Sequence, residues 1–380
     1  MTTNQQIPKT HRALVLTSTD QPPEVKTIPT PQPGPGSAVV RIEAANILTY
    51  SKYIYNGARK YPFPTPLVIG SSALGRIVAT GPDAVLLEAG KFVFVDCFVR
   101  ARDDTASAFL LGIHEGHTEK SKKLMQGEWR DATYAEYAKL PLESCYPLNE
   151  ELLVGKLGYK MEDLQEIPRN DEIDISEADL TRLMVPYGGL ADINLKLGET
   201  VVIAPATGDF GRAAVKVALA MGARVIAMGR NSELLAKLAA SDERIEWVQI
   251  TGDVQEDTKS LQAFGTVDAY FDISPREASK STHFKSCILA LKHSGRACFM
   301  GGLLDDLAIP LRSVVQKDLK LCGKWMYSRQ NVKDLIGLVE FGALKLGGQK
   351  VDKFSLDDWE KGFDTAAGYS GIDEAAIFVP

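Results

Sequence analysis

Beyond residue 199 the chain alternates short apolar runs with segments whose apolar residues recur at helical spacing. The run TVVIAPA (200–206) is typical of a buried strand, and GRAAVKVALAMGA (211–223) is typical of a helix that ends near a glycine. The alternation continues through RVIAM, NSELLAKLAAS, WVQI and VDAYFDIS. Strands that alternate with helices pair in parallel through right-handed crossovers, so these residues predict an α/β fold with a doubly wound parallel sheet.

The part of the chain before residue 199 has a different sequence pattern. RALVLT, AVVRIEAAN, LGRIVATG and KFVFVDCFV are rich in β-branched residues and are separated by stretches rich in proline and glycine. At 380 residues the chain is long enough for two domains. We predict a β-rich catalytic domain over 1–185 with charged surface insertions near 100–130 and 150–180, a nucleotide-binding domain over 186–330, and a C-terminal helix and strand over 331–380 that return to the first domain.

Composition narrows the class of protein. The net charge of −6 argues against a general nucleic-acid binder, and no stretch reaches the roughly 20 apolar residues of a membrane span. The polar start MTTNQQIPKTHR is unlike a secretory signal. The scattered cysteines contain no C-x-x-C pair, which favours buried free thiols in a reducing compartment. We expect a cytoplasmic enzyme. The cysteines are Cys97, Cys145, Cys287, Cys298 and Cys322.

The segment IAPATGDFGR (203–212) lies between the first strand and helix of the alternating region. It follows the pattern G-x-G-x-x-G except that Ala206 takes the place of the first glycine. Gly208 would let the backbone approach a pyrophosphate, and Gly211 would let the helix pack closely on the sheet. The pyrophosphate would lie at the helix N-terminus. The predicted cofactor-binding residues of this loop are Ala206, Thr207, Gly208, Asp209, Phe210 and Gly211.

The second strand ends at Gly229-Arg230-Asn231, and these residues indicate which dinucleotide is bound. A site for NAD usually places an acidic residue here to bind the ribose 2′-hydroxyl. This chain has no acid before Glu233, and Arg230 occupies the zone instead. A guanidinium pairs well with a 2′-phosphate, so we predict NADP(H).

With these residues in place, the chain resembles the medium-chain dehydrogenase/reductase superfamily over nearly all of its length. The resemblance is carried by LVIGSSALGRIVATG, PYGGL, the glycine loop with its helix, SGRACFMGG and VDKFSLDDWEKGFD. It implies a GroES-like β-rich catalytic domain packed against a Rossmann domain, with the active site in the cleft. It also implies that Gly301 and Gly302 bring backbone close to the nicotinamide. Tyr187 replaces part of a common Thr-Ala pair and is expected to face the cofactor or shape the substrate pocket.

Zinc-dependent members of the superfamily have Gly-His-Glu where this chain has Gly70-Ser71-Ser72. Their upstream catalytic cysteine would fall near Ala45–Thr49, which contains no cysteine, and their cluster of four cysteines is also missing. Serine hydroxyls are poor zinc ligands. The resemblance is therefore to the zinc-independent branch, which includes quinone oxidoreductase-like and enoyl reductase-like enzymes, and we predict no metal.

Without a metal to acidify an alcohol, reduction is the easier direction. An activated C=C bond beside a carbonyl is suitable, because hydrogen-bond donors can stabilise the charge that develops on the oxygen. We predict an NADPH-dependent reductase of an enone, an enal or a quinone-like compound. Metal-free reduction of a carbonyl group, and an NADPH-binding accessory or sensor protein without catalysis, are the alternatives.

Tyr61 is the predicted proton donor, because Tyr61-Pro62 match a G-x-Y-P pattern of this branch, although Gly57 lies further back than this pattern expects. Tyr53 is a second catalytic candidate, and Tyr50 and Tyr55 are further rivals. Asn46 matches an asparagine common in the branch and would orient the substrate or the nicotinamide ribose, unless it only caps a turn.

The histidines give no convincing site in the sequence. His114-Glu115-Gly116-His117 resembles a metal-binding spacing but lies in a charged segment, so we interpret it as a solvated loop. His11, His283 and His293 have no partner pattern. The expected partner is a small-molecule substrate, with no nucleic acid and no membrane. The protein would be a monomer or a homodimer, since LKLCGKWMY (319–327) resembles an edge strand that pairs in many members.

Overall fold

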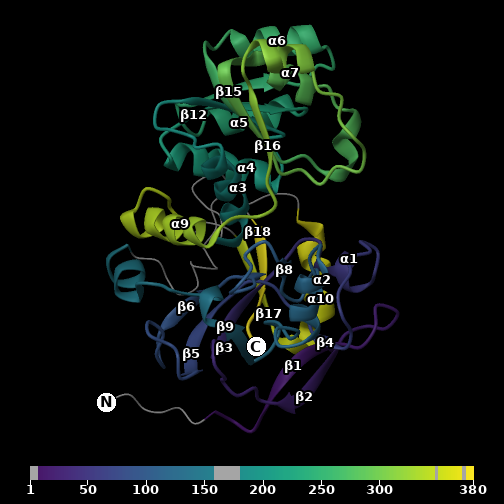
Figure 1. Ribbon diagram of the computed structural model, residues 1–380, viewed down its shortest axis with the longest axis vertical. Coiled ribbons are helices and arrows are strands. Elements are labelled where there is room, and N and C mark those ends of the chain that lie inside the picture. Colours follow the sequence, from purple (N-terminus) through teal and green to yellow (C-terminus); the bar gives the residue numbers. More distant parts are fainter. Residues whose placement is uncertain (1–6, 158–179, 347–349, 370–373) are drawn as a thin grey trace. The chain divides into compact units, whose positions relative to one another are not determined.

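The computed structural model describes residues 7–157, 180–346, 350–369 and 374–380 (Figure 1). The chain divides into two compact units. The described residues up to 157, together with 350–369 and 374–380, form the first unit, and residues 180–346 form the second.

The second unit is built on a six-stranded parallel sheet with the order β13-β12-β11-β14-β15-β16. This sheet confirms the predicted doubly wound α/β fold. The order reverses between β11 and β14, because the chain moves outward to β12 and β13 and then returns to the other side of β11. The strands are β11 (Thr200–Ala204), β12 (Arg224–Gly229), β13 (Ile245–Gln249), β14 (Val267–Asp272), β15 (Leu291–Phe299) and β16 (Lys320–Gly323).

Helices connect these strands and pack against one another beside the sheet (Figure 1). The helix α3 packs on α4 and α9, and α6 packs on α7. Asn231 caps α5 by accepting a hydrogen bond from the amide of Leu234 at 3.0 Å. The helices are α3 (Leu180–Asp192), α4 (Asp209–Ala220), α5 (Ser232–Ala239), α6 (Val254–Gln262), α7 (His283–Ala290), α8 (Leu311–Gln316) and α9 (Arg329–Phe341), with a 3₁₀ turn at Arg276–Lys280.

The PYGG motif lies inside α3 and lets this helix pack closely. A Cβ atom at Gly188 would lie 2.6 Å from the Cβ of Tyr327, and one at Gly189 would lie 2.5 Å from Sδ of Met300 and from Cε2 of Phe271. Both distances are shorter than real carbon contacts allow, so a side chain at either position would push the helix away from its neighbours.

The first unit consists of mainly antiparallel sheets around an apolar core, as expected of a GroES-like domain. Its largest sheet has the order β10-β6-β5-β3-β18-β17, and β9 also pairs with β3. The last strand, β18, pairs antiparallel with β3, where Ala376 lies opposite Ile47, and parallel with β17. The strands are β1 (Thr10–Leu16), β2 (Glu24–Pro29), β3 (Ser37–Ile47), β4 (Leu67–Val68), β5 (Ala73–Thr80), β6 (Phe92–Val95), β7 (Phe98–Arg100), β8 (Ala108–Leu110), β9 (Tyr137–Pro141), β10 (Cys145–Pro147), β17 (Lys350–Phe354) and β18 (Glu374–Phe378).

Three α-helices belong to the described part of this unit, α1 (Ser51–Tyr55), α2 (Glu119–Gln126) and α10 (Trp359–Gly368). The structure also has short 3₁₀ turns at Leu142–Ser144 and Leu356–Asp358 and a π-helix at Glu151–Lys156. The rest of the insertion expected near 150–180, up to residue 179, lies outside the described residues.

The segment near 100–130 differs from the expected charged surface insertion. The segment contains the helix α2, but the middle of the segment is buried in the core of the first unit. Phe109, Leu111, Ile113 and Met125 are all at most 3% exposed. Residues 108–113 read AFLLGI, a short apolar run, and the charged flanks obscure it.

Four of the cysteines are buried and Cys322 is half-buried, and all five are free thiols as predicted. Among the described helices, none has both the length and the hydropathy that a bilayer span requires.

Candidate functional site

The glycine loop of the second unit connects β11 to the N-terminus of α4. Gly208 is the N-cap of α4, and no side chain caps this end of the helix. No atom of the described chain lies within 4 Å of the position that a Cβ of Gly208 would take, so the space beside the helix end is open. A Cβ on Gly211 would lie 2.1 Å from the carbonyl oxygen of Pro205. The loop therefore needs Gly211 for close packing and leaves the helix N-terminus accessible to an anion.

The ends of β11 and β12 meet at this loop. The amide of Ala206 donates to the carbonyl oxygen of Met228 at 2.8 Å, and a Cβ on Gly229 would lie 3.5 Å from the Thr207 side chain. Arg230 follows directly and is exposed, and no carboxylate among the described residues pairs with its guanidinium. The loop lies at the point where the strand order reverses, which is where open α/β sheets bind dinucleotides. These residues fit a dinucleotide with an additional phosphate.

A buried polar network lies at the carboxyl end of β14, beside the same reversal. The hydroxyl of Ser274 donates to Oδ1 of Asp272 at 2.6 Å and lies 3.0 Å from Nε2 of His283. Nδ1 of His283 lies 2.6 Å from the hydroxyl of Ser281. Asp272, Ser274 and His283 are at most 3% exposed. The sequence shows no partner pattern for His283, and the structure places Ser274, Ser281 and Asp272 beside its ring. Three features of the sequence could have indicated this network: Asp272 at the end of an apolar strand, Ser274 two residues later, and His283 shortly before an apolar helical run.

The predicted residues Gly301 and Gly302 pack against this network. A Cβ on Gly301 would lie 2.7 Å from Oδ2 of Asp272, and the amide of Gly302 donates to the carbonyl oxygen of Ser274 at 3.2 Å. The backbone at 301–302 can therefore adopt its path only without a side chain at 301. Tyr187 is placed on α3, where burial raises the pKa of its hydroxyl, and its predicted contact with a cofactor stays a prediction.

In the first unit, Tyr61 lies in a cluster of aromatic and basic side chains. Nη1 of Arg59 donates to the Tyr61 hydroxyl oxygen at 3.1 Å. The guanidinium carbon of Arg59 lies 4.1 Å from the centre of the Tyr50 ring and 5.8 Å from that of the Tyr61 ring. Burial raises the pKa of Tyr50, so this phenol stays neutral. Stacking on an aromatic face and a hydrogen bond together fix the orientation of Arg59.

The segment with His114 packs against the same tyrosine. The rings of His114 and Tyr61 meet edge to face with centroids 5.3 Å apart, and the His114 and His117 centroids are 5.1 Å apart. The amide of Glu115 donates to the carbonyl oxygen of Pro62 at 2.8 Å, which ties the two segments together. The interpretation of this stretch as a solvated loop is therefore wrong for His114, because a tertiary contact with Tyr61 orders and partly buries it.

Burial, with a smaller contribution from His117, lowers the pKa of His114 to about 4. The ring is therefore neutral at physiological pH. The amide of Gly116 donates to Nδ1 of His114 at 3.0 Å, so Nδ1 is an acceptor and the single ring proton resides on Nε2.

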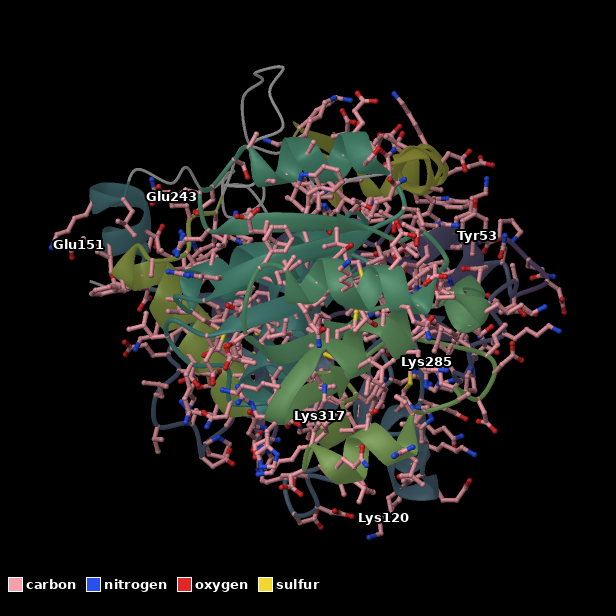
Figure 2. The ribbon with its side chains drawn as sticks, turned by 90° about the horizontal axis from the view of Figure 1, so that it is seen from above. Tyr53, Lys120, Glu151, Glu243, Lys285 and Lys317 are labelled. Atoms are coloured by element: carbon pink, nitrogen blue, oxygen red, sulfur yellow. The ribbon has the colours of Figure 1, made fainter. Side chains whose placement is uncertain are left out.

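The other catalytic candidates lie in different surroundings. Tyr53 projects from α1, is 44% exposed and lies toward the edge of the view in Figure 2. The Tyr55 hydroxyl donates to the carbonyl oxygen of Gly70 at 3.1 Å, which gives it a structural role. Asn46 lies on β3 and is 5% exposed. Its backbone carbonyl oxygen accepts hydrogen bonds from the hydroxyl groups of Ser71 and Tyr134. Among the described tyrosine side chains, those of Tyr50 and Tyr61 contact the Arg59 guanidinium. Tyr53 meets Arg59 through the backbone, where its carbonyl oxygen accepts from the Arg59 amide at 2.8 Å.

The residues at the family's zinc position do not fit the metal. Ser71 and Ser72 are 1% exposed; the Ser71 hydroxyl donates to the carbonyl oxygen of Asn46, and Ser72 accepts from the amide of Cys97. Burial raises the pKa of the Cys97 thiol to about 12. Across the ranges that the structure describes, no three His, Cys, Asp or Glu side chains converge to hold a metal ion. Zinc prefers thiolate, imidazole or carboxylate donors, and serine hydroxyls cannot replace them.

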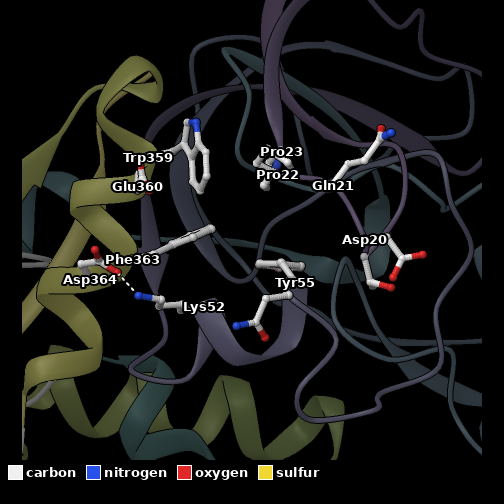
Figure 3. Close-up of a pocket in the computed structure, with 12 residues that line it drawn as sticks. Asp20, Gln21, Pro22, Pro23, Lys52, Tyr55, Trp359, Glu360, Phe363 and Asp364 are labelled. Carbon is white, nitrogen blue, oxygen red and sulfur yellow. Dashed lines mark hydrogen bonds and ion pairs between the residues drawn. The ribbon is translucent and has the colours of Figure 1, made fainter.

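The first unit also contains an aromatic pocket of about 300 Å³ between the loop after β1, α1 and α10 (Figure 3). Its walls include Tyr55, Trp359 and Phe363, and the ion pair between Lys52 and Asp364 spans one side at 2.5 Å. None of the predicted catalytic residues Tyr61, Asn46 and Tyr53 lines it. We therefore place the candidate site at the Tyr61 cluster.

Comparison with known proteins agrees with the two units. The model of the "Alcohol dehydrogenase GroES-like domain" family matches residues 34–150, and that of the "Zinc-binding dehydrogenase" family matches residues 210–340. The chain is 24% identical over 354 residues to L-threonine 3-dehydrogenase of Escherichia fergusonii, with 90% of this chain and 93% of the relative covered.

Two solved structures illustrate the likeness of the fold. One is a zinc-binding dehydrogenase from Sinorhizobium meliloti 1021 bound to NADP, with 17% identity, a TM-score of 0.70, and 98% of this chain and 100% of that chain covered. The other is a short-chain alcohol dehydrogenase from Escherichia coli complexed with NADH, with 15% identity, a TM-score of 0.73, and the same coverage of both chains. At this identity the likeness establishes the fold.

Proposed function

Because this chain belongs to the medium-chain dehydrogenase/reductase superfamily of oxidoreductases, we propose that it is a zinc-independent, NADPH-dependent reductase of activated C=C bonds. Its substrates would be enones, enals or quinone-like compounds. The observation that carries this proposal is the hydrogen bond from Arg59 to Tyr61, because it prepares a phenol as a proton donor without a metal.

The hydrogen bond gives Tyr61 a defined role. Its oxygen accepts from Arg59, so its own hydrogen is directed to another acceptor, the carbonyl oxygen of the substrate. When bound, NADPH supplies a hydride to the β-carbon. As the π electrons of the C=C bond move toward the carbonyl, Tyr61 protonates the oxygen and yields an enol. The α-carbon then takes a proton from water while the enol returns its O–H proton to the phenolate. The net reaction consumes one proton and regenerates Tyr61.

Three features support NADPH as the electron donor. The open N-terminus of α4 suits a pyrophosphate, Gly211 permits the loop path, and Arg230 offers an unpaired cation at the end of β12. We expect Arg230→Gln to raise the Kd for NADPH about 10- to 100-fold and to leave that for NADH unchanged. Arg224→Gln, at the exposed opposite end of β12, is the matched control. If Arg230→Gln raises the Kd for NADPH and the Kd for NADH equally, Arg230 does not contact a 2′-phosphate.

The activity test is NADPH oxidation with a panel of enones, enals and quinones, followed by identification of the product. A saturated carbonyl product supports the proposal, and an unsaturated alcohol contradicts C=C reduction. Tight NADPH binding without oxidation of the cofactor by any member of the panel would favour an accessory or sensor protein.

A second candidate function is metal-free interconversion of a carbonyl group and an alcohol. The relatives named L-threonine 3-dehydrogenase favour it, since their substrate is an alcohol. In this reaction Tyr61 would exchange its proton with the alcohol oxygen. Incubation with NADP⁺ and L-threonine or simple secondary alcohols distinguishes the two candidates, because a C=C reductase leaves NADP⁺ unreduced.

A further inference from the structure

We propose that the substrate carries a carboxylate and that Arg59 binds this group beside Tyr61. The inference rests on the proposed function, since it takes Tyr61 as the residue that faces the carbonyl oxygen. It extends that function from enones in general to enone acids, in which a carboxylate lies within a few bonds of the reacting C=C bond.

The first argument is that Arg59 lacks a carboxylate partner where comparable arginines have one. Among the described residues, the guanidinium of Arg59 contacts the Tyr61 hydroxyl and the rings of Tyr50 and Tyr61, and no carboxylate pairs with it. Five other arginines of the first unit each pair with a carboxylate. They are Arg12, Arg41, Arg76, Arg102 and Arg130. A partly buried cation without a counter-ion is costly unless a ligand supplies the negative charge.

The second argument is that the surroundings of Arg59 offer hydrogen-bond donors and no competing anion. Tyr50 is neutral because burial raises its pKa, so it does not neutralise the guanidinium. Neutral His114 carries its proton on Nε2 and is thus a further donor.

The third argument is geometric. Arg59 stacks on Tyr50 with 4.1 Å between the guanidinium carbon and the ring centre, so its plane is held before any ligand arrives. One of its nitrogens donates to Tyr61, and the remaining N–H groups keep the fork that binds a carboxylate through two parallel hydrogen bonds. A carboxylate bound to this fork would place the rest of a short substrate within reach of the Tyr61 hydroxyl.

The test compares an enone acid with its uncharged methyl ester, (E)-4-oxo-2-pentenoate and methyl (E)-4-oxo-2-pentenoate. For the intact protein with NADPH we expect kcat/KM to be at least about 10-fold higher for the acid. Arg59→Gln should lower the acid-to-ester ratio about 10- to 100-fold. The ratio cancels any indirect effect of the substitution on Tyr61, because that effect is common to both substrates. Arg130→Gln, which removes an exposed arginine paired with Asp131, should leave the ratio unchanged.

A second readout does not depend on turnover. Levulinate, a saturated keto acid, should bind the protein in calorimetry with and without NADP⁺, and Arg59→Gln should weaken its binding about 10-fold or more. If the acid and its methyl ester are reduced with equal kcat/KM, the carboxylate inference is overturned and the proposed function stands. If neither compound oxidises NADPH, the proposed function fails, and levulinate binding still decides whether Arg59 holds an anion. Levulinate binding that is unchanged in Arg59→Gln overturns the inference.

Discussion

Two aspartates near opposite ends of β14 allow a matched test of the cofactor site. Asp272 ends the strand beside the glycine loop, and Asp268 lies near its start. Oδ1 of Asp272 accepts hydrogen bonds from Ser274 at 2.6 Å and from Tyr270 at 3.3 Å. Oδ2 of Asp268 accepts from the amide of Thr200 at 2.8 Å. Oδ1 of Asp268 also pairs with Nζ of Lys292. Replacing either aspartate with asparagine preserves its shape. Asp272→Asn therefore disturbs the network beside the glycine loop, and Asp268→Asn disturbs an ion pair at the other end of the strand.

The expected loss of stability follows from the hydrogen bonds. Bonds to a charged group contribute about 1.5–3 kcal/mol each and neutral bonds about 0.5–1.5 kcal/mol, so weakening two of them in Asp272→Asn costs about 2 kcal/mol. In a unit of this size that lowers Tm by about 4–8 °C. Asp268→Asn should lower Tm by a similar or smaller amount.

The cofactor separates the two variants. The network at Asp272 holds the backbone of Ser274 and the close approach of Gly301. We expect Asp272→Asn to raise the Kd for NADPH at least about fivefold, or about 1 kcal/mol, while Asp268→Asn leaves it unchanged. Thermal unfolding gives Tm, and quenching of intrinsic fluorescence gives Kd. If Asp268→Asn weakens NADPH as much as Asp272→Asn does, the network has no special link to the cofactor site.

Three further predictions concern the two units separately. Gly211→Ala should abolish measurable NADPH binding, because its Cβ would meet the carbonyl oxygen of Pro205 at 2.1 Å; retained affinity in a binding titration would contradict the tight loop. Tyr61→Phe should lower kcat about 10²- to 10⁴-fold at saturating NADPH, whereas exposed Tyr53→Phe should turn over normally, and full activity of Tyr61→Phe refutes the assignment. His114 should remain neutral on nitrogen NMR down to about pH 5, since its pKa is lowered to about 4. Its folded pKa lies below the unfolded value of 6.5, so the unfolded state binds more protons between these values. Stability should therefore fall as pH drops from 6.5 toward 4, and His114→Gln should remove that part of the slope.

The sequence predicted the second unit well because its signals are local. The strand before the loop, the glycine at 211 and the asparagine that caps α5 each act within a few residues of their own position. Arg230 could be proposed as a cofactor-binding residue in the same way, since its distance along the chain from the glycine loop is set by one helix and one strand.

The Tyr61 cluster could be predicted only in part. Tyr61 stood out by its proline neighbour, but the contact with His114 joins segments more than 50 residues apart and leaves no local pattern. Charged flanks also obscured the buried residues from Phe109 to Ile113 that carry His114 into the fold. The network of Asp272 and His283 was missed for the same reason, since its bonds form only when a strand end and the start of the next helix meet.

The pairing of β18 with β3 has a consequence for biosynthesis. Ala376 lies opposite Ile47, and the ribosome must translate about 330 residues between these two partners. At about 5–20 residues per second this takes roughly 15–65 seconds. During that interval the end of β3 at Ala45–Ile47 lacks the strand that pairs with it in the folded protein, whereas Ser37–Arg41 pair with β9, which is made much earlier. An open strand edge is a template for wrong pairing with another nascent chain. The described residues of the second unit, 180–346, are contiguous and are synthesised before β18. This unit can therefore fold before the first unit has its final strand.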